Sequence, residues 1–190
     1  MENVVNDRLT ESGGYAMKTR NVESMTENLT QWVEGFTLVG MVLEAVNEIP
    51  LPMPERNFQY RGGSYRPQML LTLLSFSYAS GLYGSMDINS MVSQEKTLKY
   101  ICAGNEPEWQ TLRQFRRNYH QELQEVLIVV MQRVREMKFP KVNKTSGNDS
   151  GYLGNALSRW NSKSMVFDAV TEAKRRLQLA IAADSIAMDE

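Results

Sequence analysis

Apolar residues recur every three or four positions along most of the chain, the spacing that places them on one face of an α-helix. The first such stripe predicts a helix from Thr26, a suitable N-cap, to about Asn47. Three prolines at positions 50, 52 and 54 end this helix and predict an extended link. The apolar positions of the stripe are Trp32, Phe36, Val39, Leu43 and Val46.

The segment from Pro67 to about Ser80 is apolar around most of its circumference, which predicts a buried core helix. Pro67 suits the first helical position, and Gly81 suits the left-handed residue that follows a helix end. Two shorter helices are predicted, one from Ser85 to about Val92 and one over residues 95–103. Since no segment shows a convincing strand pattern, the predicted fold is all-α and compact.

Pro107 restarts the chain as a polar helix, which either ends near Gln121 or runs on as one bent helix to about Lys138. A short helix, a glycine turn at Gly104 and then this polar helix give the outline of a helix-turn-helix. The same outline is ordinary packing in many helical proteins, so it indicates a geometry rather than a function.

Two faces of this polar helix differ in chemistry. Leu112, Phe115 and Tyr119 share one face, while three arginines and His120 fall on a neighbouring face. A helix anchored on one side and carrying guanidinium groups on another can present charge to phosphates and base edges. The three arginines are Arg113, Arg116 and Arg117.

The remaining segments complete the predicted organisation. Residues 1–25 are polar and without periodicity, which indicates a disordered arm, and residues 26–139 form the helical domain. Residues 140–160 are rich in Asn, Ser, Gly and Lys and are typical of a flexible linker. Residues 161–190 form an amphipathic C-terminal helix, separate in sequence, which we expect to dock on the domain or to pair with another chain. Its apolar stripe includes Asp184, and charged residues 174–176 interrupt it.

The composition of the chain limits which kinds of functional site it can contain. The net charge of −1 gives no general attraction to nucleic acid, so any such site must come from local clustering. A single cysteine, Cys102, makes neither an internal disulfide nor a CxxC metal pair, and we expect a buried structural thiol. No apolar run reaches the length of a membrane span, and the N-terminus lacks a secretory pattern. The expected location is the cytoplasm.

Four sequence blocks, taken in order, carry a family resemblance over about residues 60 to 135. The chain resembles the N-terminal (InsH-like) DNA-binding domain of bacterial insertion-sequence transposases of the DDE class. The blocks are Tyr65-x-Pro67-x-Met69-Leu70-Leu71-x-Leu73-Leu74, Tyr78-Ala79-x-Gly81, Leu98-x-Tyr100-Ile101-x-Ala103-Gly104 and Pro107-x-x-x-Thr111-Leu112-x-x-Phe115-Arg116-Arg117.

The resemblance implies that the chain binds double-stranded DNA through its arginine-bearing helix. In this interpretation the three arginines contact phosphate or guanine, two polar residues at the start of the helix add hydrogen bonds, and Arg66 adds a phosphate contact. Without the resemblance, the same arginines are typical of a solvated surface. The expected DNA-binding residues are Gln110, Thr111, Arg113, Arg116, Arg117 and Arg66.

Two departures from the family limit this interpretation. Met86 stands where the family has an arginine, and Asn143 stands where one branch has its first catalytic aspartate. The carboxylates of the family's catalytic core follow beyond the point that corresponds to Glu190, and phosphoryl transfer of this kind needs them to clamp metal ions. We therefore expect no complete catalytic core, no cofactor and no small-molecule substrate.

The resulting prediction is a transposase-derived protein that recognises insertion-element ends, either a truncated transposase or a regulator of transposition. Its expected partner is DNA, and both a homodimer and pairing with a full-length transposase stay open. One alternative is a helical protein-interaction module that has lost DNA binding, which the net charge and Met86 favour. Another is a DDE enzyme fragment that a second chain completes.

Overall fold

A computed structural model describes residues 27–52, 56–61, 63–138 and 168–186 of the chain. The predicted arm 1–25, the N-cap Thr26, the linker 140–160 and the position of Asn143 lie outside the described residues. The prediction of a compact, mostly helical fold is confirmed. A single turn of 3-10 helix, η1 (Leu29–Gln31), precedes the α-helices. These are α1 (Gly35–Glu48), α2 (Pro67–Ala79), α3 (Ser85–Val92), α4 (Lys96–Cys102), α5 (Trp109–Asn118), α6 (His120–Lys138) and α8 (Ala169–Ile186).

Helix α2 is the centre of the fold, as its all-round apolar sequence predicts. Every residue from Leu70 to Ala79 is buried, and α1, α4, α5, α6 and α8 all pack against this helix. Pro67 occupies its first turn, and Gly81 after its end has a φ of 84°. A side chain at Gly81 would be strained at this φ, so glycine suits the turn that sends the chain into α3.

A short β-hairpin corrects the expectation that the chain has no strand. Strands β1 (Phe58–Tyr60) and β2 (Gly63–Tyr65) pair antiparallel, with Phe58 opposite Tyr65. Three residues are too few to display a strand's alternation in the sequence. Tertiary packing holds the hairpin instead, because the Phe58 ring meets the Phe115 ring edge-on at 5.1 Å between centroids.

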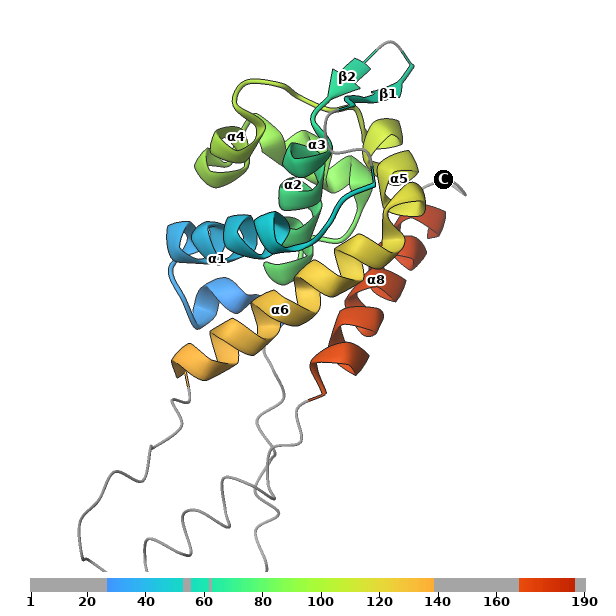
Figure 1. Cartoon of the computed structure of the whole chain (residues 1–190). Helices are drawn as coiled ribbons and strands as arrows, with labels where there is room; N and C mark the ends of the chain where they lie inside the picture. Colours follow the sequence, from blue (N-terminus) through green and yellow to red (C-terminus); the bar gives the residue numbers. More distant parts are fainter. Residues whose placement is uncertain (1–26, 53–55, 62, 139–167, 187–190) are drawn as a thin grey trace, which may run out of the picture.

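The polar helix after Pro107 is divided into α5 and α6. Tyr119, with φ −119° and ψ 36°, ends α5, and α6 begins at His120. Of the two predicted forms, a helix ending near Gln121 or one bent helix, the structure has two helices that meet at a single non-helical residue. This break lets α5 turn toward the hairpin while α6 runs on along α1 (Figure 1).

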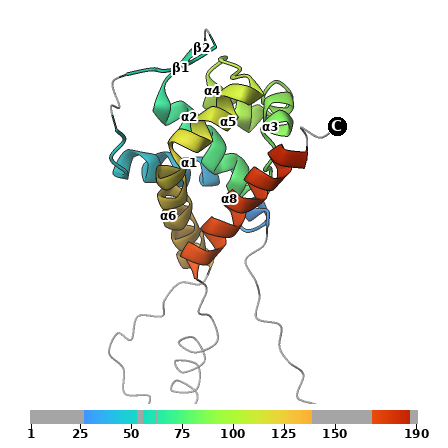
Figure 2. The ribbon, with the colours of Figure 1, turned by 90° about the vertical axis from the view of Figure 1, so that its right-hand side faces the viewer.

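Helix α8 docks on the rest of the fold, one of the two outcomes expected for the C-terminal helix. Ala173, Leu177 and Ala180 are buried against it and belong to the same core as α2 and α6. Figure 2 shows α8 running beside α6 and reaching α3. Although it is separate in sequence, α8 therefore completes the core of the domain.

Candidate nucleic-acid interface

Arg116, the central arginine of the predicted DNA-binding face, lies inside the protein. Its side chain is only 3% exposed, and its Nη2 lies 2.5 Å from the Asp184 carboxylate of α8. Its Nη1 donates to the Tyr78 hydroxyl of α2 at 3.3 Å. Burial alone lowers the pKa of Arg116, but Tyr78 and Asp184 outweigh it and leave the pKa above its usual value. The expectation that Arg116 meets DNA directly is thus corrected by its place in the core.

The reason lies in the helical geometry of α5. Arg116 follows Leu112 by one turn and adjoins Phe115, so it sits at the edge of the buried face. Thr111, also expected to contact DNA, is only 2% exposed and falls on this buried side too. Neither side chain reaches the surface of α5.

The partner of Arg116 also joins α8 to α3. The Asp184 carboxylate accepts hydrogen bonds from the backbone N–H of Ser85 at 2.7 Å and from its hydroxyl at 2.8 Å. Ser85 is the first residue of α3, where unpaired N–H groups favour a negative charge. Gly84 occupies the N-cap position of α3, and Asp184 supplies the capping carboxylate from α8.

A second buried charge, Arg176 of α8, binds the other end of the α2–α3 connection. Its Nη1 donates to the carbonyl oxygens of Tyr78 and Ala79 at 2.7 and 3.0 Å, and to that of Glu27 at 2.7 Å. Its Nε donates to Glu172 at 2.9 Å. The side chain is fully buried. Sequence reasoning treated Arg176 as an interruption of the apolar stripe and missed this role.

The hairpin turn contacts the start of α5 through polar side chains. Arg61 in the hairpin turn donates from Nη1 to the side-chain oxygen of Gln110 in the first turn of α5. Arg113 is half-buried and Arg117 is exposed, and they follow Gln110 by three and seven positions on the same side of the helix. We call Arg61, Gln110, Arg113 and Arg117 the hairpin–α5 surface.

A small pocket opens where α5, α6 and α8 meet. Its volume is about 240 Å³, and its lining carries the cations of α5 and no carboxylate. Within it, the buried Nε of Arg116 has no hydrogen-bond acceptor among the described residues. Such an unpaired buried donor costs free energy unless a ligand or water accepts from it. The lining residues are Arg113, Arg116, Arg117, His120, Ile181 and Ser185.

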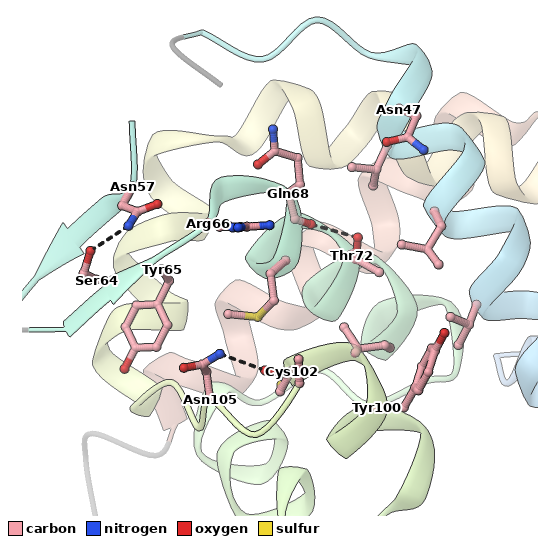
Figure 3. A pocket seen from close by; sticks show the side chains of 16 residues that line it. Asn47, Asn57, Ser64, Tyr65, Arg66, Gln68, Thr72, Tyr100, Cys102 and Asn105 are labelled. Carbon is pink, nitrogen blue, oxygen red and sulfur yellow. Dashed lines mark hydrogen bonds between the residues drawn. The ribbon is translucent and has the colours of Figure 1, made fainter. Parts of the chain in front are cut away.

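Arg66, the remaining expected DNA contact, lies apart from these arginines. It precedes α2 and lines a larger pocket of about 600 Å³ among the hairpin, α1, α2 and α4 (Figure 3). Cys102 also lines this pocket and is buried, in agreement with the structural thiol expected from the sequence. Burial, with a smaller effect of Glu106, raises the pKa of Cys102 to about 12 and disfavours the thiolate.

Within residues 27–52, 56–61, 63–138 and 168–186, no group of three or more His, Cys, Asp or Glu side chains could hold a metal ion. None of the helices in these ranges combines the length and apolarity needed to cross a bilayer.

Comparison of the chain with protein families, with curated proteins and with solved structures finds no match.

Proposed function

We propose that this protein binds double-stranded DNA through the hairpin–α5 surface, as a transposase-derived protein that recognises insertion-element ends. In this proposal it acts in the cytoplasm, in transposition or in its regulation. The observation that carries the proposal is the contact between Arg61 and Gln110. It brings a second basic element, the hairpin turn, beside the predicted recognition helix.

A helix and an adjoining hairpin can contact a duplex at two places. The major groove of DNA admits an α-helix, and in this proposal the polar side of α5 enters it so that Gln110 and Arg113 read base edges. Arg61 of the hairpin lies beside the start of α5, and Arg117 lies near its end. In this proposal the two arginines bind phosphates on the two sides of the groove. Of the six residues expected from the sequence, Gln110, Arg113 and Arg117 thus keep a surface role. Thr111 and Arg116 support the helix from inside, and Arg66 lies apart.

The pocket of α5, α6 and α8 adds an anchoring point for one phosphate. Arg113, Arg117 and His120 line it, and no carboxylate does. Guanidinium groups bind phosphate oxygens with paired hydrogen bonds, so a backbone phosphate at the mouth of this pocket would meet two of them. Met86 is 48% exposed on α3, and it offers no charge where the related family has an arginine.

Fluorescence anisotropy with a labelled duplex tests the proposal. The wild-type chain should bind, and its affinity should fall steeply between about 50 and 200 mM salt because phosphate contacts release counterions. The triple variant Arg61→Ala, Arg113→Ala, Arg117→Ala should lose most of this affinity, and each lost phosphate contact should reduce the salt slope by about one. Circular dichroism should show unchanged helicity.

A control variant that loses the same number of positive charges elsewhere tests whether DNA binding depends on the hairpin–α5 surface or only on total charge. Lys96, Lys99 and Lys138 are exposed on α4 and α6, away from the hairpin–α5 surface. Their triple alanine variant should bind DNA nearly as well as wild type. Equal losses in both triple variants, or no binding by the wild-type chain, would refute the proposed surface.

Sequence recognition needs a separate measurement. Selection from a pool of random duplexes should enrich one motif, and Gln110→Ala should relax the choice at one or two base positions with about 1–3 kcal/mol less discrimination at each. Enrichment of no motif would leave binding without recognition and would contradict the role at insertion-element ends.

A protein-interaction module is the second candidate, and one apolar patch favours it. Phe36 of α1 and Tyr100 of α4 are 57% and 64% exposed, although their rings pack edge-on at 6.1 Å. Leu43, two turns further along α1, is 41% exposed. Exposed apolar groups gathered in one place are typical of interaction sites. Sedimentation of the wild-type chain against Phe36→Ser, Tyr100→Ser tests the simplest case, in which the patch joins two copies and the variant is monomeric.

A further inference from the structure

The pocket of about 600 Å³ lies in the angle formed by the hairpin, the start of α2, α1 and α4, and no residue of α8 lines it (Figure 3). Its volume falls within the range of pockets that hold small molecules, roughly 300–1,000 Å³. Its lining comes from four separate elements, so the tertiary fold creates it rather than a local turn.

One side of the pocket is apolar. Helix α1 contributes Val39, Leu43 and Val46, while α2 and α4 contribute Met69 and Ile101. Val39 and Val46 are nearly fully buried, which fixes this wall in the core, whereas Leu43 is 41% exposed at the mouth. A hydrocarbon chain or ring placed against this wall would remove exposed apolar surface from water.

The opposite side is polar and carries positive charge. Asn57, Ser64, Tyr65 and Arg66 lie on the hairpin side, across the pocket from Tyr100 (Figure 3). The Asn57 amide donates to the Ser64 hydroxyl at 3.1 Å, which holds these two side chains in position. Burial, and then the charge of Glu108, raises the pKa of Tyr65, so its hydroxyl stays protonated and able to donate.

The charges that line the pocket determine which ligands it can bind. Arg66 is the one charged residue among those that line it, and no Asp or Glu lines it. Within the described ranges Arg66 makes no ion pair, and it is exposed at the pocket rim. A negatively charged group beside Arg66 would therefore meet a cation and neutral hydrogen-bond donors.

We propose that this pocket binds a small amphipathic anion, with its apolar body against α1 and α4 and its carboxylate or phosphate beside Arg66. The inference is independent of DNA binding, because none of the residues of the hairpin–α5 surface lines the pocket. It also goes beyond the expectation of no small-molecule ligand and gives Arg66 a role other than DNA contact.

Three probes separate the two halves of the proposed ligand. Octanoate has both an apolar chain and a carboxylate, octanol has the chain alone, and inorganic phosphate has the charge alone. In titrations of the full chain followed by amide NMR, octanoate should shift the resonances of residues 63–72 and 100–105. Octanol should shift the same resonances with lower affinity, and inorganic phosphate should leave them unchanged.

Two variants, each with a matched control, test which residues bind the charged group and the apolar body of the ligand. Arg66→Gln should weaken octanoate about tenfold, the usual effect of losing a charged hydrogen-bond partner, and should change octanol binding less than about twofold. The exposed Arg56 lines no part of the pocket, so Arg56→Gln should bind both probes as wild type does. Leu43→Glu should weaken both probes, while Thr37→Glu, on an exposed position of the same helix, should weaken neither.

Octanoate that shifts no resonance of the pocket, or shifts only those around Phe36, which does not line it, would show that the pocket binds no such anion. Equal affinity for octanoate and octanol, unchanged by Arg66→Gln, would remove the charged half. Unchanged dispersion of the amide spectrum confirms that each variant is folded.

Discussion

The Nη2 atom of Arg116 lies 2.5 Å from the Oδ2 atom of Asp184, although 68 residues separate them in the chain. Both side chains are almost fully buried, at 3% and 5% exposure. The pair connects α5, which carries the proposed recognition residues, to α8, the last described helix of the chain. The orientation of α5 therefore depends on a helix that lies far from it in the sequence.

Breaking this buried pair should destabilise the fold strongly. Arg116→Met and Asp184→Asn should each cost about 3–5 kcal/mol, because each leaves the other charge buried without its partner. Urea unfolding followed by circular dichroism measures the cost. The matched control is Arg117→Met, one position along α5, which should change the free energy of unfolding by less than about 0.5 kcal/mol because Arg117 is exposed.

The double variant Arg116→Met, Asp184→Asn provides the sharper test of coupling. Residues in direct contact are non-additive, so the double variant should be less destabilised than the sum of the two single variants by about 1 kcal/mol or more. Additive costs would show that the two side chains act separately and that the ion pair does not exist in solution.

The neighbouring residues Arg175 and Arg176 should differ greatly in their effect on stability. Arg176→Met leaves the carbonyl oxygens of Tyr78, Ala79 and Glu27 without their donor, and we expect a loss of about 3 kcal/mol or more. Arg175 is 40% exposed and pairs with Glu172 near the surface, so Arg175→Met should cost at most about 1 kcal/mol. The same unfolding experiment compares the two, and similar costs would contradict the assigned positions.

The acid stability of the protein should depend on Glu172. Burial raises the pKa of Glu172, but hydrogen bonds from Arg175 and Arg176 outweigh it, and the pKa lies below its usual value. The folded state therefore binds this proton more weakly than the unfolded state. The stabilisation is present above the unfolded pKa, about 4.3, and is lost as the pH falls through the lower folded pKa.

Comparison of wild type with Glu172→Gln across pH tests this linkage. The wild type should be more stable by about 1–2 kcal/mol near pH 7, the value of charge-assisted hydrogen bonds, and the difference should shrink below about pH 4.3. Glu34→Gln, at an exposed position before α1, serves as the control for general charge effects. A difference that does not vary with pH would show that the carboxylate charge of Glu172 contributes nothing.

The thiol of Cys102 should be protected while the protein is folded. The side chain is fully buried, and burial raises its pKa to about 12, so both access and thiolate formation are suppressed. A thiol-specific reagent at pH 8 should label it only after unfolding in urea. Labelling of the native protein at the rate of the unfolded chain would show that the pocket wall around Cys102 opens.

The sequence predicted the central features of the fold because they depend on local rules. Pro67 at the start of α2, Gly81 after its end and the apolar circumference between them are properties of one segment. The hairpin escaped prediction because Phe58 is held by Phe115, a residue far along the chain, and three-residue strands carry no pattern of their own. Tertiary packing, not propensity, decides that element.

The candidate site was only partly predictable for a related reason. The helical repeat places Arg116 on the polar face of α5, next to the boundary with the buried face. A long side chain at such a boundary can turn either way, and here the buried Asp184 carboxylate draws it into the core. A signal was present in the C-terminal stripe, where Asp184 occupied an apolar position. A carboxylate on one apolar stripe and an arginine at the edge of another indicate a buried pair, provided that the two helices are known to meet.

The carboxylate that α8 supplies to α3 and α5 has a consequence for protein synthesis. The ribosome makes α3 and α5 well before α8, so the emerging chain carries Arg116 and the start of α3 without their counter-charge. A nascent polypeptide that ends before Asp184 should stay loosely packed and open to chaperones and proteases. Full order should come only after translation has passed this residue and α8 has left the exit tunnel.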